Sequence, residues 1–184
     1  LYVFCGDELL VAYLRPSDLD ACQHARAVLK LLVQRLRAAW PKVKITIRAD
    51  SGFCRWRLMR WCDSHGLGSV LGLAKNTVLE RAARDEIERA QRQFCRTGQP
   101  QRVFGSFSYA AKSWDRKRRV IVKAEHTAQG PNPRYVVANV PGDPQELYED
   151  VYCQRGEAEN RIKEQQLDLF ADRTSCHRFL ANQF

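Results

Sequence analysis

Near the end of its first quarter the chain carries the stretch Val43-Lys-Ile-Thr-Ile-Arg-Ala-Asp50-Ser-Gly52-Phe. Val43, Ile45 and Ile47 alternate with polar residues, and this period of two predicts a β-strand that ends at Asp50. Asp and Ser followed by Gly after a strand are ordinary turn and helix-cap residues. The same position also holds a carboxylate at a rigid strand end, so Asp50 is a candidate for either role.

Outward from this strand, strands and helices alternate along the chain. Two strands joined by a turn at Gly6-Asp7 come first, and a helix that stops at Pro41 follows them. After Asp50 we expect a helix, a short buried strand and a charged amphipathic helix. The predicted ranges are 2–5, 9–14, 20–40, 54–65, 69–73 and 78–95. This order predicts a mixed α/β sheet flanked by helices.

The next section is rich in β-strand patterns. Residues 103–109, 119–125 and 134–139 are expected to be strands, and the short connections between them predict an antiparallel meander. We divide the chain into a first core part (1–98), an inserted β-rich subdomain (99–143) and a C-terminal core part (144–184), and we expect the meander to form a separate sheet. A final helical region spans about 145–166. Gly156 within it costs about 1 kcal/mol relative to Ala, which predicts a break or kink there.

Charges of both signs crowd that last helix, in Tyr152-Cys-Gln-Arg155-Gly-Glu157-Ala-Glu159-Asn-Arg161-Ile-Lys163. Spacings of three and four residues place Tyr152, Arg155 and Glu159 on one helical face. Glu157 lies about 200° around the helix from Glu159. Opposite charges four residues apart also decorate ordinary solvated helices. Spacing alone therefore leaves a solvated face and a functional site both open.

Together the two segments resemble the DDE-type transposases of bacterial insertion sequences, whose catalytic domain is RNase H-like. The resemblance rests on Arg-Ala-Asp50-Ser-Gly-Phe and on Tyr152, Arg155 and Glu159, which look like the Tyr-Arg-Glu signature around the last catalytic acid. It extends over nearly the whole chain. The long form of the signature has a Lys seven residues after the Glu, where this chain has Gln166, and Lys163 is the candidate substitute.

The resemblance implies an enzyme that cleaves and transfers DNA strands at insertion-sequence ends with Mg²⁺, or with Mn²⁺ in its place. Asp50 and Glu159 would be catalytic, metal-binding acids, because two hard cations held by carboxylates stabilise in-line displacement at phosphorus. Arg155 and Lys163 would hold the scissile phosphate. Tyr152 would either donate a hydrogen bond to a phosphate or pack beneath the helix. Related enzymes also imply a homodimer in the synaptic complex.

A first catalytic Asp is implied on an opening strand, ahead of the region that residues 1–14 resemble. We therefore expect that this strand is missing and that the chain is a fragment, which would bind DNA without cutting it. Acids within the chain are poor replacements. Asp7 falls in the predicted hairpin turn, while Asp18 and Asp20 fall at the predicted start of a helix.

Composition predicts a polyanionic partner, DNA. Thirty Lys and Arg against 21 Asp and Glu give a formal net charge of +9. The basic stretch Lys112-Ser-Trp114-Asp-Arg116-Lys117-Arg118 is either a DNA clamp, with the indole stacked on a base, or a solvated hairpin tip. No apolar run approaches the roughly 20 residues of a membrane span. Seven Cys without zinc or disulfide spacing predict reduced thiols in the cytoplasm, where a bacterial transposase would be nucleoid-associated.

Two other functions use the same features. An RNase H-like nuclease that cuts without joining would need the same acids, and a strand-transfer assay would separate it from a transposase. A catalytically inactive DNA-binding remnant would keep the basic surface alone.

Overall fold

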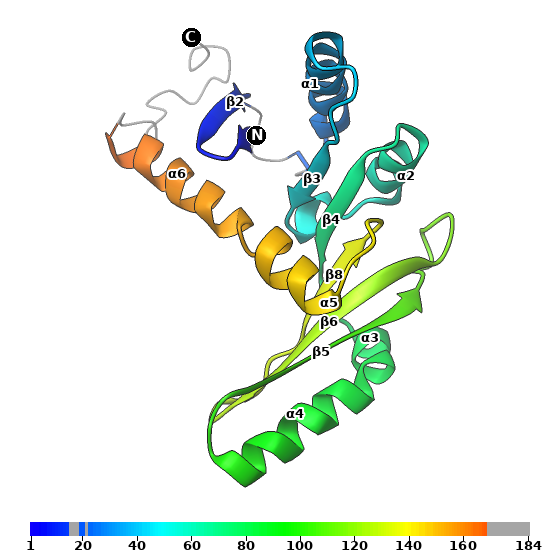
Figure 1. The fold of residues 1–184 in the computed structure, drawn as a ribbon, viewed down its shortest axis with the longest axis vertical. Coiled ribbons are helices and arrows are strands. Elements are labelled where there is room, and N and C mark those ends of the chain that lie inside the picture. The colour runs from blue at the N-terminus through cyan, green and yellow to red at the C-terminus, as the bar shows by residue number, and fades with distance from the viewer. Residues whose placement is uncertain (15–18, 21, 169–184) are drawn as a thin grey trace.

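A computed structural model describes residues 1–14, 19–20 and 22–168. Its centre is a six-stranded sheet with the order β3-β4-β8-β6-β5, to which the short β7 adds by pairing with β6 (Figure 1). The strands are β1 (Tyr2–Cys5), β2 (Glu8–Ala12), β3 (Thr46–Ala49), β4 (Gly68–Leu73), β5 (Gln101–Tyr109), β6 (Arg118–Thr127), β7 (Gly130–Pro131) and β8 (Arg134–Ala138).

The helices lie on both faces of this sheet. They are α1 (Ala25–Ala39), the 3-10 turn η1 (Ser51–Phe53), α2 (Trp56–Ser64), α3 (Thr77–Ala82), α4 (Arg84–Thr97), α5 (Pro144–Glu146), the π-helical η2 (Leu147–Tyr152) and α6 (Arg155–Asp168). Within the described part of the chain, none of these helices has the length and apolar character that a membrane crossing needs.

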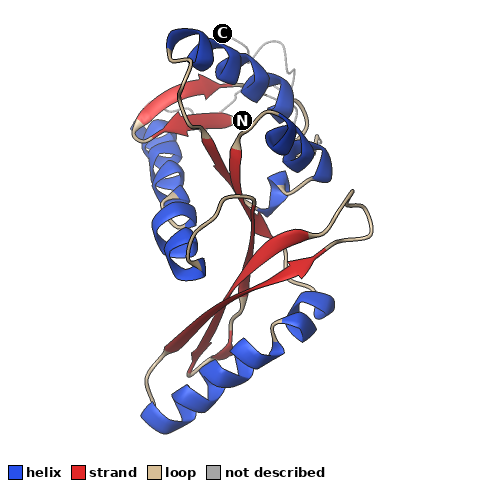
Figure 2. Ribbon diagram, turned by 45° about the vertical axis from the view of Figure 1, so that its right-hand side comes forward, coloured by secondary structure: helices blue, strands red, loops and turns tan. Residues whose placement is uncertain are grey.

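The strand directions confirm the expected mixed α/β fold of the RNase H-like type. β3 and β4 are parallel, with Thr46 opposite Gly68, and the other pairs in the sheet are antiparallel. The first two strands form the predicted hairpin, with Gly6 at a φ of 58° in its turn. That hairpin is a separate two-stranded sheet beside α6 (Figure 2).

Three clusters of buried side chains hold the layers together. One face of the sheet packs against α3 and α4, around residues such as Leu79, Ala90 and Val122. The other face packs against α5 and η2. The third cluster joins α1 to α2 through Val33, Leu58 and neighbouring side chains. The sheet is thus covered on both faces, which explains why Val120, Ile121 and Val122 are all fully buried.

The prediction that the meander forms a separate sheet is wrong. β5, β6 and β8 are consecutive antiparallel strands as expected, but β8 also pairs with β4, with Leu71 opposite Val137. The short connections determine which strands neighbour one another within the meander, whereas the pairing of β8 with β4 depends on contacts distant in sequence. The boundaries of residues 99–143 as an inserted segment stay a prediction.

Several element ends also differ from expectation. α1 begins at Ala25, about five residues later than predicted, after His24 at a φ of 65°. The predicted helix 78–95 is divided at Ala83 into α3 and α4. The last helical region does break, but between η2 and α6, so the break precedes Gly156.

Candidate active site

Asp50 follows β3 directly and caps η1. Its Oδ1 accepts a hydrogen bond from the backbone N–H of Gly52 at 2.8 Å. Its other oxygen, Oδ2, accepts no hydrogen bond from any described residue, and the side chain is exposed. Asp50 can therefore cap η1 and bind a ligand at the same time, because Oδ1 orients the carboxylate and Oδ2 remains available.

Tyr152 ends η2 and lies half-buried against β4. A Cβ added to Gly72 would lie 2.5 Å from the Tyr152 Oη and 3.1 Å from the backbone nitrogen of Ser51. The phenol thus packs beneath the helix, on a glycine at the level of Asp50 and Ser51. Because Gly72 has no side chain, the Tyr152 phenol can occupy this space.

Arg155 lies over the ring of Tyr152, with its Cζ 5.7 Å from the ring centroid. Burial raises the pKa of the Tyr152 phenol, the charge and hydrogen bond of Arg155 act to lower it, and the charge of Asp50 acts to raise it. Tyr152 lies beside the backbone of Asp50 and Ser51 and Arg155 lies over its ring, so the structure brings both residues of the last helical region to the strand end that carries Asp50.

Glu159 and Lys163 both lie on α6, and Lys163 is exposed. The side chain of Glu159 lies outside the described residues, so its approach to Asp50 stays a prediction. Asp18 also lies outside them. The other two acids considered as replacements hold guanidinium groups. Asp7 accepts from Arg161 at 2.9 Å, and Asp20 accepts from Arg55 at 2.7 Å.

Arg48 contributes to the site in a way that sequence reasoning did not identify. Its Nη1 donates to the carbonyl of Val151 at 2.9 Å and to the Oε1 of Gln154 at 3.2 Å. The alternation of the strand showed only that Arg48 occupies a polar position. Its partners, more than a hundred positions away in the chain, left no signal in the sequence around it.

The basic stretch 112–118 lies elsewhere. It forms the loop between β5 and β6, and Arg119 in β6 is opposite Ala138, which is itself opposite Val70 near the start of β4. Because β3 and β4 are parallel, this loop leaves the sheet at the end where β3 and β4 begin, whereas Asp50 lies where β3 ends. The structure does not bring the basic stretch to Asp50.

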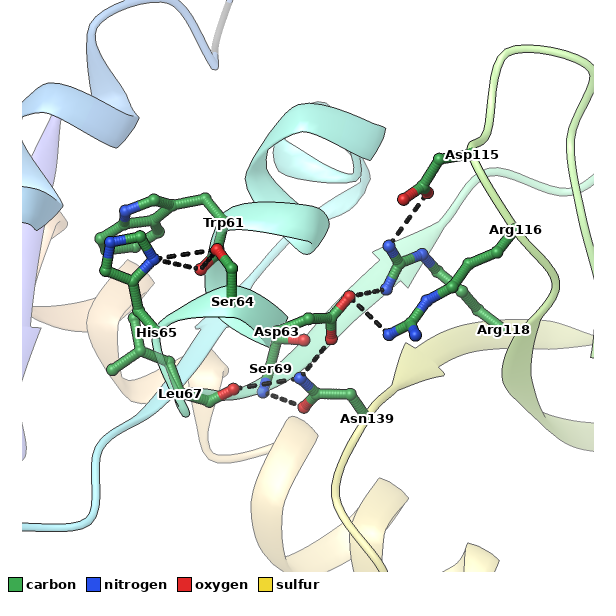
Figure 3. Close-up of polar contacts among 10 residues, drawn as sticks. All are labelled: Trp61, Asp63, Ser64, His65, Leu67, Ser69, Asp115, Arg116, Arg118 and Asn139. Carbon is green, nitrogen blue, oxygen red and sulfur yellow. Dashed lines mark hydrogen bonds and ion pairs between the residues drawn. The ribbon is translucent and has the colours of Figure 1, made fainter.

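Asp63 of α2 holds two cations, Arg116 in this loop and Arg118 at the start of β6 (Figure 3). Asp63 Oδ2 lies 2.6 Å from Arg118 and 2.7 Å from Arg116, and Arg118 also contacts Asp115 at 3.1 Å. The side chain of Arg118 is only 4% exposed. Arg118 therefore faces protein carboxylates, and its expected contact with a DNA phosphate stays a prediction.

The remaining residues of the loop differ in exposure. Trp114 is half-buried against the core and meets Tyr109 edge-on, with ring centroids 5.4 Å apart. Lys112 and Lys117 are exposed, as is Arg116 beside its ion pair. The stacking surface expected of Trp114 is thus partly covered by the protein, whereas the two lysines face solvent.

No cluster of three His, Cys, Asp or Glu side chains that could hold a metal ion occurs among the described residues. Asp50 is nevertheless suited to a hard divalent cation, because its exposed Oδ2 accepts no hydrogen bond from the part of the chain that the structure describes. The six described cysteines are all free thiols. Burial raises the pKa of Cys54 and of Cys62 to about 12, so neither is a reactive thiolate.

Comparison with known families agrees with this geometry. The sequence matches the protein family described as transposase DDE domain, group 1, over residues 1–184. No curated protein matched the chain.

Proposed function

Because the chain belongs to the transposase DDE domain family, group 1, we propose that it acts in metal-dependent cleavage and strand transfer at the ends of a bacterial insertion sequence. The observation that supports this most directly is the meeting of its two motif segments. Tyr152 packs on Gly72 beside the backbone of Asp50 and Ser51, so segments from opposite ends of the chain converge at one strand end.

In this proposal Asp50 and Glu159 hold Mg²⁺, or Mn²⁺ in its place. When bound, such ions stabilise the charge on the attacking and leaving oxygens of an in-line displacement. Arg155 and Lys163 hold the phosphate that is cut, since a guanidinium and an ammonium both donate to phosphate oxygens. Tyr152 supports Arg155 from below, because the guanidinium lies over its ring.

The basic loop contributes a separate DNA contact in this proposal. This loop lies at the end of the sheet opposite to Asp50. DNA contacts from its residues Lys112, Trp114, Arg116 and Lys117 would therefore fall outside the cleaved phosphodiester. Two copies would act together on two DNA ends. The setting would be the bacterial cytoplasm, at the nucleoid.

The test is a cleavage assay with protein expressed from its complete reading frame, on duplexes that carry the insertion-sequence end. We expect Asp50→Asn and Glu159→Gln to lower cleavage on the order of 10³-fold, as when a group that stabilises developing charge is removed. DNA binding in a gel shift should change little. Asp85→Asn, at an exposed acid of α4, is the matched control.

Two outcomes would change the proposal. Unchanged cleavage by both acid variants would overturn the assignment of the acids. Cleavage without any joined product in the presence of target DNA would favour the nuclease that cuts without joining.

A further inference from the structure

The junction between η2 and α6 exposes backbone groups that a continuous helix would satisfy. The N–H of Cys153 still donates to the carbonyl of Tyr148 at 2.9 Å, but the N–H of Gly156 donates to Cys153 at 2.9 Å. The last carbonyls of a helix lack intrahelical donors, so a side-chain donor is favourable at this junction.

Arg48 supplies one such donor from the neighbouring strand. Its Nη1 binds the carbonyl of Val151 at 2.9 Å and also reaches the side chain of Gln154, in the two-residue link before α6, at 3.2 Å. A cation is favourable at this end of a helix because it opposes the partial negative charge of the free carbonyls. One guanidinium thus joins the end of η2 to the link that follows it.

Tyr152 provides a second attachment of the same junction to the sheet. Its phenol occupies the space above Gly72 of β4, while Arg48 lies on the adjacent strand β3. Two neighbouring strands therefore hold the junction at two points. These points set where α6 starts and in which direction it leaves the sheet.

We propose that Arg48 is a positioning residue for the acid-bearing helix. By fixing the junction, it sets where α6, the helix that carries Arg155 and Glu159, begins relative to Asp50, which follows Arg48 by two positions in the chain. This inference rests on the proposed function, because it gives the placement a catalytic purpose. Arg48 contacts no reacting group itself. The requirement is strict, since functional groups must be held within about 0.5 Å of the productive geometry.

The shape of the guanidinium matters as well as its charge. Arg presents several donors in a fixed plane and can serve two acceptors together, whereas Lys is a flexible point charge. Arg48→Lys should therefore keep a hydrogen bond to one acceptor, and Arg48→Met should lose both. Arg60→Met is the matched control, because Arg60 is an exposed arginine of α2 with no partner among the described residues.

The first measurement is independent of catalysis. Amide hydrogen exchange should be faster in the peptide covering residues 155–168 of Arg48→Met than in the wild-type protein. Exchange in the β6 peptide, residues 118–127, should be unchanged. Arg60→Met should match wild-type exchange in both peptides. Equal exchange across 155–168 in wild-type protein and Arg48→Met would overturn the inference.

The second measurement is the Mg²⁺ dependence of end cleavage. The Mg²⁺ concentration for half-maximal cleavage should rise roughly 10-fold in Arg48→Met, the lower end of the effect of losing a group that orients a metal ligand. Arg48→Lys should fall between this variant and the wild-type protein. If Arg48→Met does not fold, Arg48→Lys carries the test.

The two proposals fail differently. If Asp50→Asn abolishes cleavage while both Arg48 variants keep wild-type exchange and Mg²⁺ dependence, only the positioning role is overturned. If Asp50→Asn cleaves normally, the proposed function itself is wrong.

Discussion

Asp63 joins four segments of the chain through one carboxylate. Its oxygens accept hydrogen bonds from Arg118 and Asn139 and form an ion pair with Arg116. The Asn139 side chain also donates to the carbonyl of Leu67 and accepts from the N–H of Ser69. The end of α2, the start of β4, the end of β8 and the loop before β6 are thus linked (Figure 3). Burial acts to raise the pKa of Asp63, but hydrogen bonds from Asn139 and Arg118 and the charges of both arginines outweigh it and lower that pKa.

We therefore predict that Asp63→Asn destabilises the protein by about 3 kcal/mol at neutral pH, the lower end for breaking a buried ion pair. Because the folded pKa is lowered, the ionised Asp63 stabilises the fold above the unfolded pKa of about 3.9. That contribution is lost as the pH falls through the folded pKa. Urea unfolding between pH 7 and pH 3 should show a shallower acid loss in Asp63→Asn than in wild type. An equal pH dependence in both would contradict this.

Gly72 lies where a larger side chain would collide with Tyr152. We predict that Gly72→Ala costs about 1–3 kcal/mol, as overpacking of a core does, because its Cβ would lie 2.5 Å from the Tyr152 Oη. Tyr152→Phe removes that oxygen, so the double variant should recover about 1 kcal/mol relative to the sum of the single changes. Urea unfolding of the four proteins measures this coupling. Simple additivity would show that the phenol does not occupy this space in solution.

At the scale of elements, local patterns identified most strands and helices. The alternation around Ile45 and Ile47 predicted β3, and the hairpin turn at Gly6 was correct because each depends on neighbouring residues. The pairing of β8 with β4 was not predictable in this way. Both strands are apolar on two faces, so their patterns show that they are covered without showing which strands lie beside them.

In the candidate site too, residues in local motifs were predictable, whereas residues with partners distant in the chain were not. Asp50 and the helical face shared by Tyr152 and Arg155 were found from the spacing of short motifs, which can be read without knowing the fold. Arg48 and Gly72 were missed because each meets a partner distant in the chain, Arg48 the carbonyl of Val151 and Gly72 the phenol of Tyr152. The ion pairs of Arg116 and Arg118 were missed for the same reason. Their partner Asp63 is distant in the chain, so the sequence showed a run of cations without showing that two of them are paired.

The continuity of the sheet has a consequence for how the elements unfold. Because β6 and β8 belong to the same sheet as β4, we predict that the meander and the α1–α2 side unfold in one cooperative transition. Trp114 reports on the meander and Trp61 on the α1–α2 side. Variants that keep either Trp114 or Trp61 as the sole tryptophan, with the other three of the four changed to Phe, should have the same urea midpoint by fluorescence. An earlier midpoint for Trp114 would show that residues 99–143 unfold as an independent unit.

At the scale of the whole molecule, charge determines how the protein meets DNA. The formal net charge is +9, but an ion-paired cation such as Arg118 contributes little to a DNA contact. If Lys112, Arg116, Lys117, Arg155 and Lys163 each meet one phosphate, the slope of log K against log salt should be about −4.5. Binding to a random-sequence duplex, measured by fluorescence anisotropy across a salt series, tests this expectation.

The exposed lysines of the loop give the sharpest version of that test. Lys112→Ala combined with Lys117→Ala should make the slope shallower by about 2, since each lost phosphate contact reduces it by about 1. Lys30→Ala combined with Lys42→Ala, at two exposed lysines in α1 and just after it, removes the same number of charges, should leave the slope unchanged and so controls for net charge. If the slope became equally shallow in the loop variant and in the control, the net charge would act on DNA without a defined interface. A slope unchanged by the loop variant would remove the loop from the DNA-binding surface and leave the contacts to α6, which carries Arg155 and Lys163.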